Sequence, residues 1–132
     1  MLRVHSPLSA DVETLVHDTI GCCLRVHKEL GPGLLELVYS KAVAIELKTA
    51  GIAFEREKAF PASYRGEFLC DQRFDFVVGG KLILEIKAIE QIANVHHQQL
   101  LHYMRLSKLP VGLLINFNVA YLRDGGIVRK VL

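Results

Sequence analysis

Two acidic side chains and one lysine lie close together in the middle of the sequence, where the surrounding residues are apolar. Glu85 and Lys87 follow the run Leu82-Ile83-Leu84, which is typical of a strand buried on both faces. Residues two positions apart share a face of a strand, so Glu85 and Lys87 are expected roughly 7 Å apart. A carboxylate and an ammonium at such a place are costly unless they are paired or bound to a metal.

Asp75 joins this group only if the turn before the buried strand has an odd number of residues. Ten positions separate Asp75 from Glu85, and Gly79-Gly80 marks a turn between two antiparallel strands. A two-residue turn would place Asp75 beside Leu84, on the wrong face. A three-residue turn that adds Lys81 places Asp75 directly opposite Glu85. The spacing therefore predicts the three-residue turn, or a bulge with the same effect.

Two carboxylates that face each other require a cation or a proton, because like charges this close repel each other. Oxygen ligands alone suit a hard cation such as Mg²⁺ or Mn²⁺, which keeps several of its waters. Such a metal polarises a phosphoryl oxygen and activates a water, and Lys87 would add positive charge near the reacting phosphorus. The spacing alone leaves a second interpretation open, which is a simple ion pair between lysine and carboxylate.

The periodicity of apolar residues predicts the elements that position these side chains. Ser9 is expected to cap the first helix, Gly51 to end the second, and Pro61 to end the first strand. The order of elements predicts one α/β domain over residues 1–132, with a mixed central sheet flanked by helices. The predicted helices span about 10–30, 34–50 and 94–107, and the predicted strands span about 52–60, 62–64, 68–78, 81–87 and 111–117, followed by a hairpin over 121–132.

Composition and charge exclude several classes of protein. The 132 residues are the length of one domain, and 51% of them are apolar, which fits a well-filled core or a core plus a buried dimer face. The net charge of +2 is far from that of a protein that coats DNA without specificity. The three cysteines form neither a disulfide nor a zinc pattern, and no apolar run has the length of a membrane span. We therefore expect a cytoplasmic protein that is not attached to a membrane.

The residues Asp75 and Glu85-Ile86-Lys87 resemble the signature of the PD-(D/E)xK nuclease superfamily. Arg73-Phe74-Asp75 resembles the R-x-D form of its first acidic motif, with Phe74 where the usual proline stands. Glu36 stands on a helix before the sheet, where many members place an extra metal-ligating glutamate. Gln99 and Tyr103 resemble the Q-x-x-x-Y motif of the RecB-type branch, and one helical turn separates them.

A closer resemblance extends over nearly the whole chain. The segment from Gly33 to Tyr39, Gly-Leu-Leu-Glu-Leu-Val-Tyr, is similar to the motif that names the small bacterial GxxExxY proteins. The segments 26–33 and 113–118 resemble the same family. This resemblance implies the PD-(D/E)xK fold, also called the restriction-endonuclease-like fold. It does not settle activity, because the function of that family is poorly defined.

The resemblance also implies a role for each residue of these motifs. The metal ligands would be Asp75, Glu85, Glu36 and the backbone carbonyl of Ile86. Lys87 would stabilise charge, while Gln99 and Tyr103 would position the substrate backbone or the lysine. The candidates for substrate binding are Arg73, through a phosphate, and Tyr39.

Two functions are compatible with these residues. The first is a metal-dependent nuclease that hydrolyses phosphodiester bonds in nucleic acid, with DNA as the expected substrate. The second is a nuclease-fold protein that binds nucleic acid or a partner protein without cutting, which the low net charge and the high apolar content favour. Under either interpretation we expect a homodimer.

Overall fold

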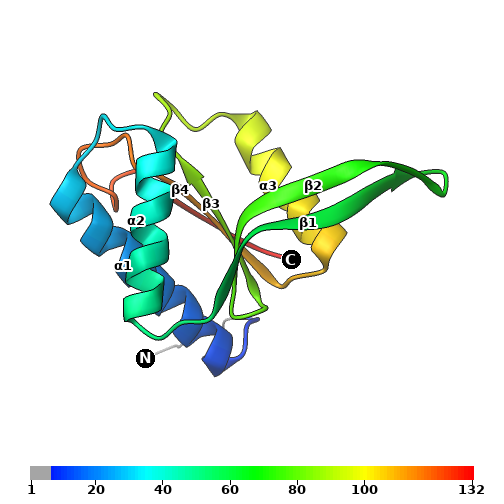
Figure 1. Ribbon diagram of the computed structural model, residues 1–132, viewed down its shortest axis with the longest axis horizontal. Helices are drawn as coiled ribbons and strands as arrows, with labels where there is room; N and C mark the ends of the chain where they lie inside the picture. Colours follow the sequence, from blue (N-terminus) through cyan, green and yellow to red (C-terminus); the bar gives the residue numbers. More distant parts are fainter. Residues whose placement is uncertain (1–6) are drawn as a thin grey trace.

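The computed structural model describes residues 7–132, in which three helices and five strands follow one another along the chain (Figure 1). The helix boundaries lie within two residues of the predicted ones, and the first and third helices match them in full. The helices are α1 (Ala10–Leu30), α2 (Glu36–Thr49) and α3 (Asn94–Ser107), and the strands are β1 (Phe54–Tyr64), β2 (Glu67–Val78), β3 (Leu82–Lys87), β4 (Val111–Asn116) and β5 (Ile127–Val131).

The five strands form one mixed sheet in the order β1-β2-β3-β4-β5. The pairs β1–β2, β2–β3 and β4–β5 are antiparallel, whereas β3 and β4 are parallel. A parallel pair needs a crossover, and α3 supplies it between β3 and β4. The predicted class, an α/β mixed sheet flanked by helices, is confirmed.

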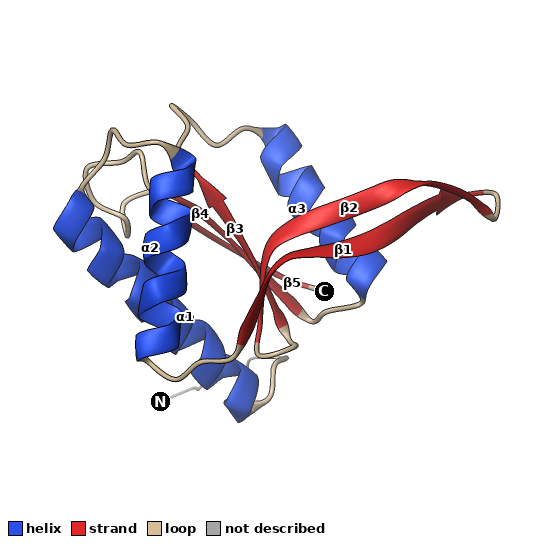
Figure 2. Ribbon diagram, in the orientation of Figure 1, coloured by secondary structure: helices blue, strands red, loops and turns tan. Residues whose placement is uncertain are grey.

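The helices cover the sheet in two layers (Figure 2). α1 and α2 pack together and contact one face, and α3 contacts the other. Within β3, Leu82, Leu84 and Ile86 belong to the core beneath α1 and α2, and Ile83 belongs to the core beneath α3. This alternation explains why β3 is apolar almost throughout, because both of its faces are covered. It also directs Glu85, two positions after Ile83, towards the α3 side.

The turn between β2 and β3 has the three residues that the spacing predicts. β2 ends at Val78 and β3 begins at Leu82. Gly79 and Gly80 have φ values of 57° and 66°, a region that favours glycine. A Cβ on Gly79 would also lie 2.9 Å from the side chain of Leu15 in α1. The resulting register pairs Val78 with Leu82, and thus sets up the position of Asp75.

Two predicted strand boundaries are wrong. β1 does not end at Pro61 but continues through it to Tyr64. Proline is tolerated there because β1 is an edge strand, where one side of the backbone makes no ladder bonds. Residues 121–132 do not form a hairpin of their own either. Instead β5 pairs with β4, because β4 would otherwise present an open apolar edge.

The β1–β2 hairpin extends beyond the body of the sheet (Figure 1). Residues 63–71 at its far end are all exposed, and the turn lies at Arg65-Gly66, as predicted. We call this distal part, residues 59–73, the arm. Within residues 7–132, no helix combines the length and the apolar character needed to cross a bilayer.

Candidate active site

Asp75 and Glu85 meet across β2 and β3, at the point where the backbone ladder ends. The last paired residues are Phe76 and Leu84, and one further step of the same register places Asp75 opposite Glu85. At this step the backbone N–H groups donate to side-chain carboxylates of the opposite strand. The N–H of Asp75 donates to Glu85 Oε1 at 3.2 Å, and the N–H of Ile86 donates to Asp75 Oδ2 at 2.8 Å. Each carboxylate is therefore held by the backbone of the neighbouring strand.

A break in the β1–β2 ladder accompanies this arrangement. The rungs on either side are formed, but Glu57 and Asp75 do not pair. Glu57 has a φ of 52°, in the left-handed region that non-glycine residues rarely adopt. The twist at this point turns Phe76 towards α1 and α2, and Phe74 towards α3. Asp75 lies between these two phenylalanines. Residues two positions apart on a strand normally share a face, but here the side chains before and after Asp75 belong to opposite core layers.

The electrostatics of the pair follow from its burial. Glu85 is 4% exposed, and Asp75 is half-buried. Burial, and after it the negative charge of Asp75, raise the pKa of Glu85 to about 9. At neutral pH the pair therefore holds a proton on Glu85 when no cation is bound. Deprotonation of Glu85 would concentrate two negative charges at this point, and a divalent cation is the partner that stabilises them.

Lys87 ends β3 on the same face as Glu85. Its positive charge lowers the pKa of Glu85 and that of Glu36, although other effects outweigh it at both residues. Lys87 forms no direct ion pair with any residue among 7–132. The simple ion pair between lysine and carboxylate, the alternative that the spacing left open, is therefore not formed. The ammonium remains near the carboxylates without neutralising them.

Asn116 fixes the segment that follows Lys87, and its role was not foreseen. It is 2% exposed and lies opposite Lys87 in the β3–β4 register. Its Oδ1 accepts from the N–H of Ile89 at 3.1 Å and from that of Asn118 at 3.2 Å. Its Nδ2 donates to the carbonyl of Ile89 at 3.0 Å. A single asparagine inside the apolar run 111–117 was the signal that could have identified it.

Glu36 begins α2 at the margin of the carboxylate pair. Partial burial raises the pKa of its carboxyl, Lys87 lowers it, and Asp75 raises it. Glu36 is thus within electrostatic reach of both residues. The side chain as a whole is exposed, and a hydrogen bond from the backbone of Ala88 also lowers the pKa of its carboxyl. The structure brings Glu36 to the site, as the sequence suggests, but as a neighbour of the pair.

Tyr39 lies one helical turn after Glu36 and is fully buried. Its hydroxyl donates to the carbonyl of Gly31 at 2.6 Å and accepts from the N–H of Leu34 at 3.1 Å. Its ring stacks on Phe117 at a centroid distance of 4.6 Å. No part of the side chain is left for a substrate, so the expected substrate contact is not supported. Tyr39 instead holds the turn that places Glu36.

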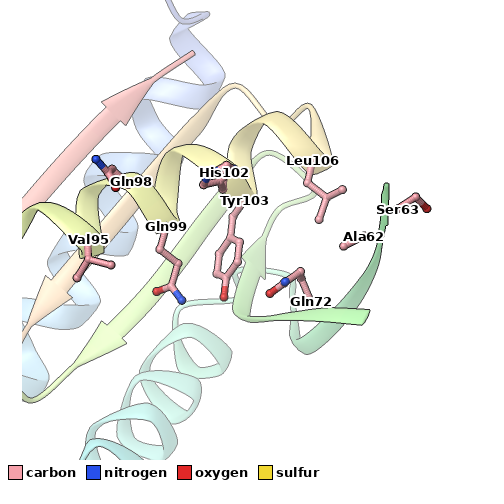
Figure 3. A pocket seen from close by; sticks show the side chains of 9 residues that line it. All are labelled: Ala62, Ser63, Gln72, Val95, Gln98, Gln99, His102, Tyr103 and Leu106. Atoms are coloured by element: carbon pink, nitrogen blue, oxygen red, sulfur yellow. The ribbon is translucent and has the colours of Figure 1, made fainter. Parts of the chain in front are cut away.

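The other side of the pair is formed by α3, where Tyr103 and Gln99 extend from one face of the helix (Figure 3). Burial, and after it the charges of Glu85 and Asp75, raise the pKa of Tyr103. The Tyr103 ring stacks on Phe74 at 4.4 Å, and Phe74 stacks on Phe60 of the arm at 4.5 Å. This aromatic stack fixes the distance between α3, β2 and β1.

Arg73 lies two residues before Asp75, and its side chain is exposed. Its guanidinium donates to the carbonyl of Glu57 at 3.5 Å, at the break in the β1–β2 ladder. This is a long hydrogen bond at the surface, so it leaves the guanidinium accessible. A phosphate contact by Arg73 remains a prediction.

The donor set fits a hard divalent cation with few protein ligands. Among residues 7–132, no three side chains of His, Cys, Asp or Glu gather closely enough to hold a metal ion. Asp75 and Glu85 therefore offer two carboxylates, and the remaining positions would be open to water and substrate. Mg²⁺ binds in this way, through one or two carboxylates, whereas structural Zn²⁺ requires four nitrogen or sulfur ligands. Glu36 would have to move to become a third ligand.

Comparison with known proteins agrees with this geometry. A family model of the PD-(D/E)XK nuclease superfamily matches residues 13–130, which include every residue of the site. No curated protein and no solved structure matches the chain. The matched region covers all five strands except the last residue of β5, and it includes the carboxylate pair. The chain belongs to the PD-(D/E)XK nuclease superfamily.

Proposed function

We propose that the protein is a metal-dependent nuclease that hydrolyses phosphodiester bonds, with DNA as its substrate. The observation that carries this proposal is the Asp75–Glu85 pair, two carboxylates held by backbone N–H groups at the open end of β3 with an unpaired lysine beside them. A structural ion pair would leave neither a second carboxylate that needs a proton or a cation nor a free ammonium. Membership of the PD-(D/E)XK superfamily supports the same conclusion.

Asp75 and Glu85, with the carbonyl of Ile86, would hold Mg²⁺ or Mn²⁺, and the bound ion would polarise a phosphoryl oxygen and lower the pKa of a water. Glu85 would release its proton when the ion binds. Lys87 would stabilise the negative charge that develops on the phosphoryl oxygens.

The residues around the pair would orient the substrate. Glu36 is placed to accept a hydrogen bond from the attacking water, because its exposed carboxyl is within reach of Asp75 and Lys87. Gln99 and Tyr103 would position the strand from the α3 side, and Arg73 would contact a phosphate from β2.

The test combines metal binding with cleavage. Isothermal titration calorimetry with Mg²⁺ and Mn²⁺ on wild type, Glu85→Gln and Lys87→Met would be run beside cleavage assays on single-stranded and double-stranded DNA and RNA. Glu90→Gln is the matched control, because Glu90 is an exposed carboxylate on the loop after β3. We expect Glu85→Gln to lose metal binding and cleavage, and Lys87→Met to lose cleavage by about a hundredfold or more while it still binds metal. Equal cleavage by all four proteins would contradict the proposal.

A second function, binding without cleavage, is favoured by the apolar side chains that the surface leaves uncovered. Leu35, which directly precedes α2, is 76% exposed, and Leu37 and Ile45 of α2 are 58% and 65% exposed. Uncovered apolar groups of this size mark places where partners bind. This alternative predicts no metal-dependent cleavage of any of the four substrates. It also predicts that the Glu85→Gln variant binds the partner as wild type does.

A further inference from the structure

A pocket of about 550 Å³ opens between the arm and α3, and Tyr103 is one of the residues that line it (Figure 3). The arm supplies one wall, with Ala62 and Gln72, and α3 supplies the other. The volume is in the range of sites that bind small molecules. The two walls come from separate parts of the sequence, residues 62–72 and 95–106. The pocket was not foreseen from the sequence.

The chemistry of the pocket suits a ligand that is neutral, flat and polar at its edges. No Asp, Glu, Lys or Arg lines it among the described residues, so it is not built for a phosphate or another ion. The polar groups are instead amides and an imidazole, from Gln72, Gln98, Gln99 and His102, and the hydroxyls of Ser63 and Tyr103. Each glutamine amide offers a donor and an acceptor side by side, the pattern that the edges of nucleobases also present.

These polar groups are available to a ligand. Within residues 7–132, none of the side chains of Gln72, Gln98, Gln99 and His102 makes a hydrogen bond to another residue. Apolar side chains, among them Val95 and Leu106, provide surface against which a flat ring can pack. In Figure 3, Gln72 lies across the pocket from Gln99 and Tyr103.

Tyr103 connects the pocket to the candidate active site. Its ring lines the pocket and also stacks on Phe74, which directly precedes Asp75. Its hydroxyl is close enough to Glu85 and Asp75 for their charges to act on it. A nucleotide whose phosphate lies at the carboxylates would therefore have a base within reach of the pocket.

We propose that this pocket binds one unpaired nucleobase of the strand that the protein cleaves, so that the substrate is single-stranded at the active site. The inference rests on the proposed function and adds the class of substrate. In a duplex, the base edge is paired and both faces of the base are stacked, so a base can enter a walled pocket only from a single strand or after it leaves the helix. Amides on both walls would then bind its edge, and the apolar side chains its faces.

The test measures whether affinity depends on bases, in the absence of metal so that no cleavage occurs. Fluorescence anisotropy would compare labelled single-stranded DNA and RNA with an abasic strand of the same length and charge, in buffer with EDTA. Ala62→Trp fills the pocket from the arm, and Gln72→Ala removes one amide. The matched controls are Ala59→Trp, at an exposed alanine of the same strand, and Gln91→Ala, at an exposed glutamine outside the pocket.

We expect wild type to bind the strand with bases about tenfold more tightly than the abasic strand. Ala62→Trp should abolish this difference, Gln72→Ala should reduce it, and both controls should retain it. Equal affinity for the two strands in wild type, a difference that survives in Ala62→Trp, or no binding of any strand would overturn the proposal.

A cleavage assay with Mg²⁺ separates this inference from the proposed function. Cleavage without base-dependent binding would support the nuclease proposal and contradict the proposal that the pocket binds a base. Base-dependent binding without cleavage would leave the pocket as the binding site of a protein that does not cut. Preference for duplex over single-stranded substrate in that assay would also contradict the pocket proposal.

Discussion

At the scale of single residues, a proton and a metal cation compete for the carboxyl group of Glu85. Glu85 is buried beside Asp75, and this environment raises the pKa of Glu85 to about 9. The proton that it carries must leave before a cation can bind there. Metal binding and proton release are therefore coupled at the carboxylate pair.

This coupling predicts how metal affinity depends on pH. Below about pH 9, each metal ion displaces the proton of Glu85, so the affinity for Mg²⁺ or Mn²⁺ should rise by up to about tenfold for each pH increment of one. Calorimetry between about pH 6 and about pH 8 checks this, and repeating it in buffers of different ionisation enthalpy counts the protons released. An affinity that is independent of pH over this range would show that Glu85 is already ionised.

Stability without metal should depend on pH in the opposite sense to that of an ordinary paired carboxylate. The folded protein keeps a proton on Glu85 up to about pH 9, whereas the unfolded chain loses it near 4.5. The folded state thus binds more protons between these values, and its free energy of unfolding falls as pH rises. Glu85→Gln has no such proton. Near pH 8.5 and in EDTA, we expect it to be more stable than wild type by about 3 kcal/mol.

Urea unfolding at about pH 5 and about pH 8.5 measures this difference. The variant should gain most of its advantage at the higher pH, and Glu90→Gln, at an exposed carboxylate, should gain none. A Glu85→Gln variant that is less stable than wild type at both values would show that the carboxylate is stabilising as an anion.

The residues of the site differ in how far the sequence could predict them. Asp75 and Glu85 could be placed together because strand parity and a turn length are enough to fix a face. The break in the ladder at Glu57 could not be predicted, since glutamate carries no signal for a positive φ. Tyr39 was expected at the substrate because its motif includes it, but burial is decided by the packing of Phe117 against it.

At the scale of elements, the site depends on how the segment after β3 is held. Lys87 is the last residue of β3, and the next residues leave the sheet. Asn116 of β4 substitutes for the missing ladder, since its amide bonds both the N–H and the carbonyl of Ile89. Asn116 therefore holds the chain directly after Lys87, while the β3–β4 ladder holds the backbone of Lys87 itself.

Asn116→Ala should remove these hydrogen bonds, leave the half-buried N–H of Ile89 without its partner, and leave its carbonyl only the long bond from Asn118. We expect the free energy of unfolding to fall by about 2 to 3 kcal/mol, and cleavage to fall further because Lys87 is less well placed. Asn118→Ala is the control, since Asn118 is half-buried and its amide makes one long bond of 3.4 Å. Chemical denaturation measures both variants, and equal losses for the two would contradict the role given to Asn116.

Element boundaries were predictable where a residue has a local reason to begin or end a helix. Ser9 caps α1 through its side chain, and Gly51 follows α2 with a φ of 71°. Strand boundaries depended on neighbours instead. β1 passes through Pro61 because it lies at an edge, and β5 exists because β4 offers it an open side. Neither fact can be inferred from the residues of that segment alone.

At the scale of the whole molecule, two sets of apolar side chains are uncovered among the described residues, one on the arm and one on α2. The side chains of the arm, such as Phe68 and Leu69, are neighbours on a strand and point to opposite sides of a thin ribbon. On α2, Leu37, Val38 and Ile45 recur at helical spacing and share one side, which also carries the exposed Lys41. Leu34, two residues before α2 begins, is exposed as well.

The uncovered apolar side chains of α2 predict a homodimer in which the same side of α2 in two copies pairs around a twofold axis. Ile45 is 65% exposed on this side of α2, so Ile45→Lys should place two charges in the interface and yield a monomer. Phe68→Lys, on the arm, is the matched control and should remain a dimer. Sedimentation velocity distinguishes the species. A monomeric wild type would mean that α2 is uncovered for a different partner, and a dimer that persists in Ile45→Lys would place the interface elsewhere.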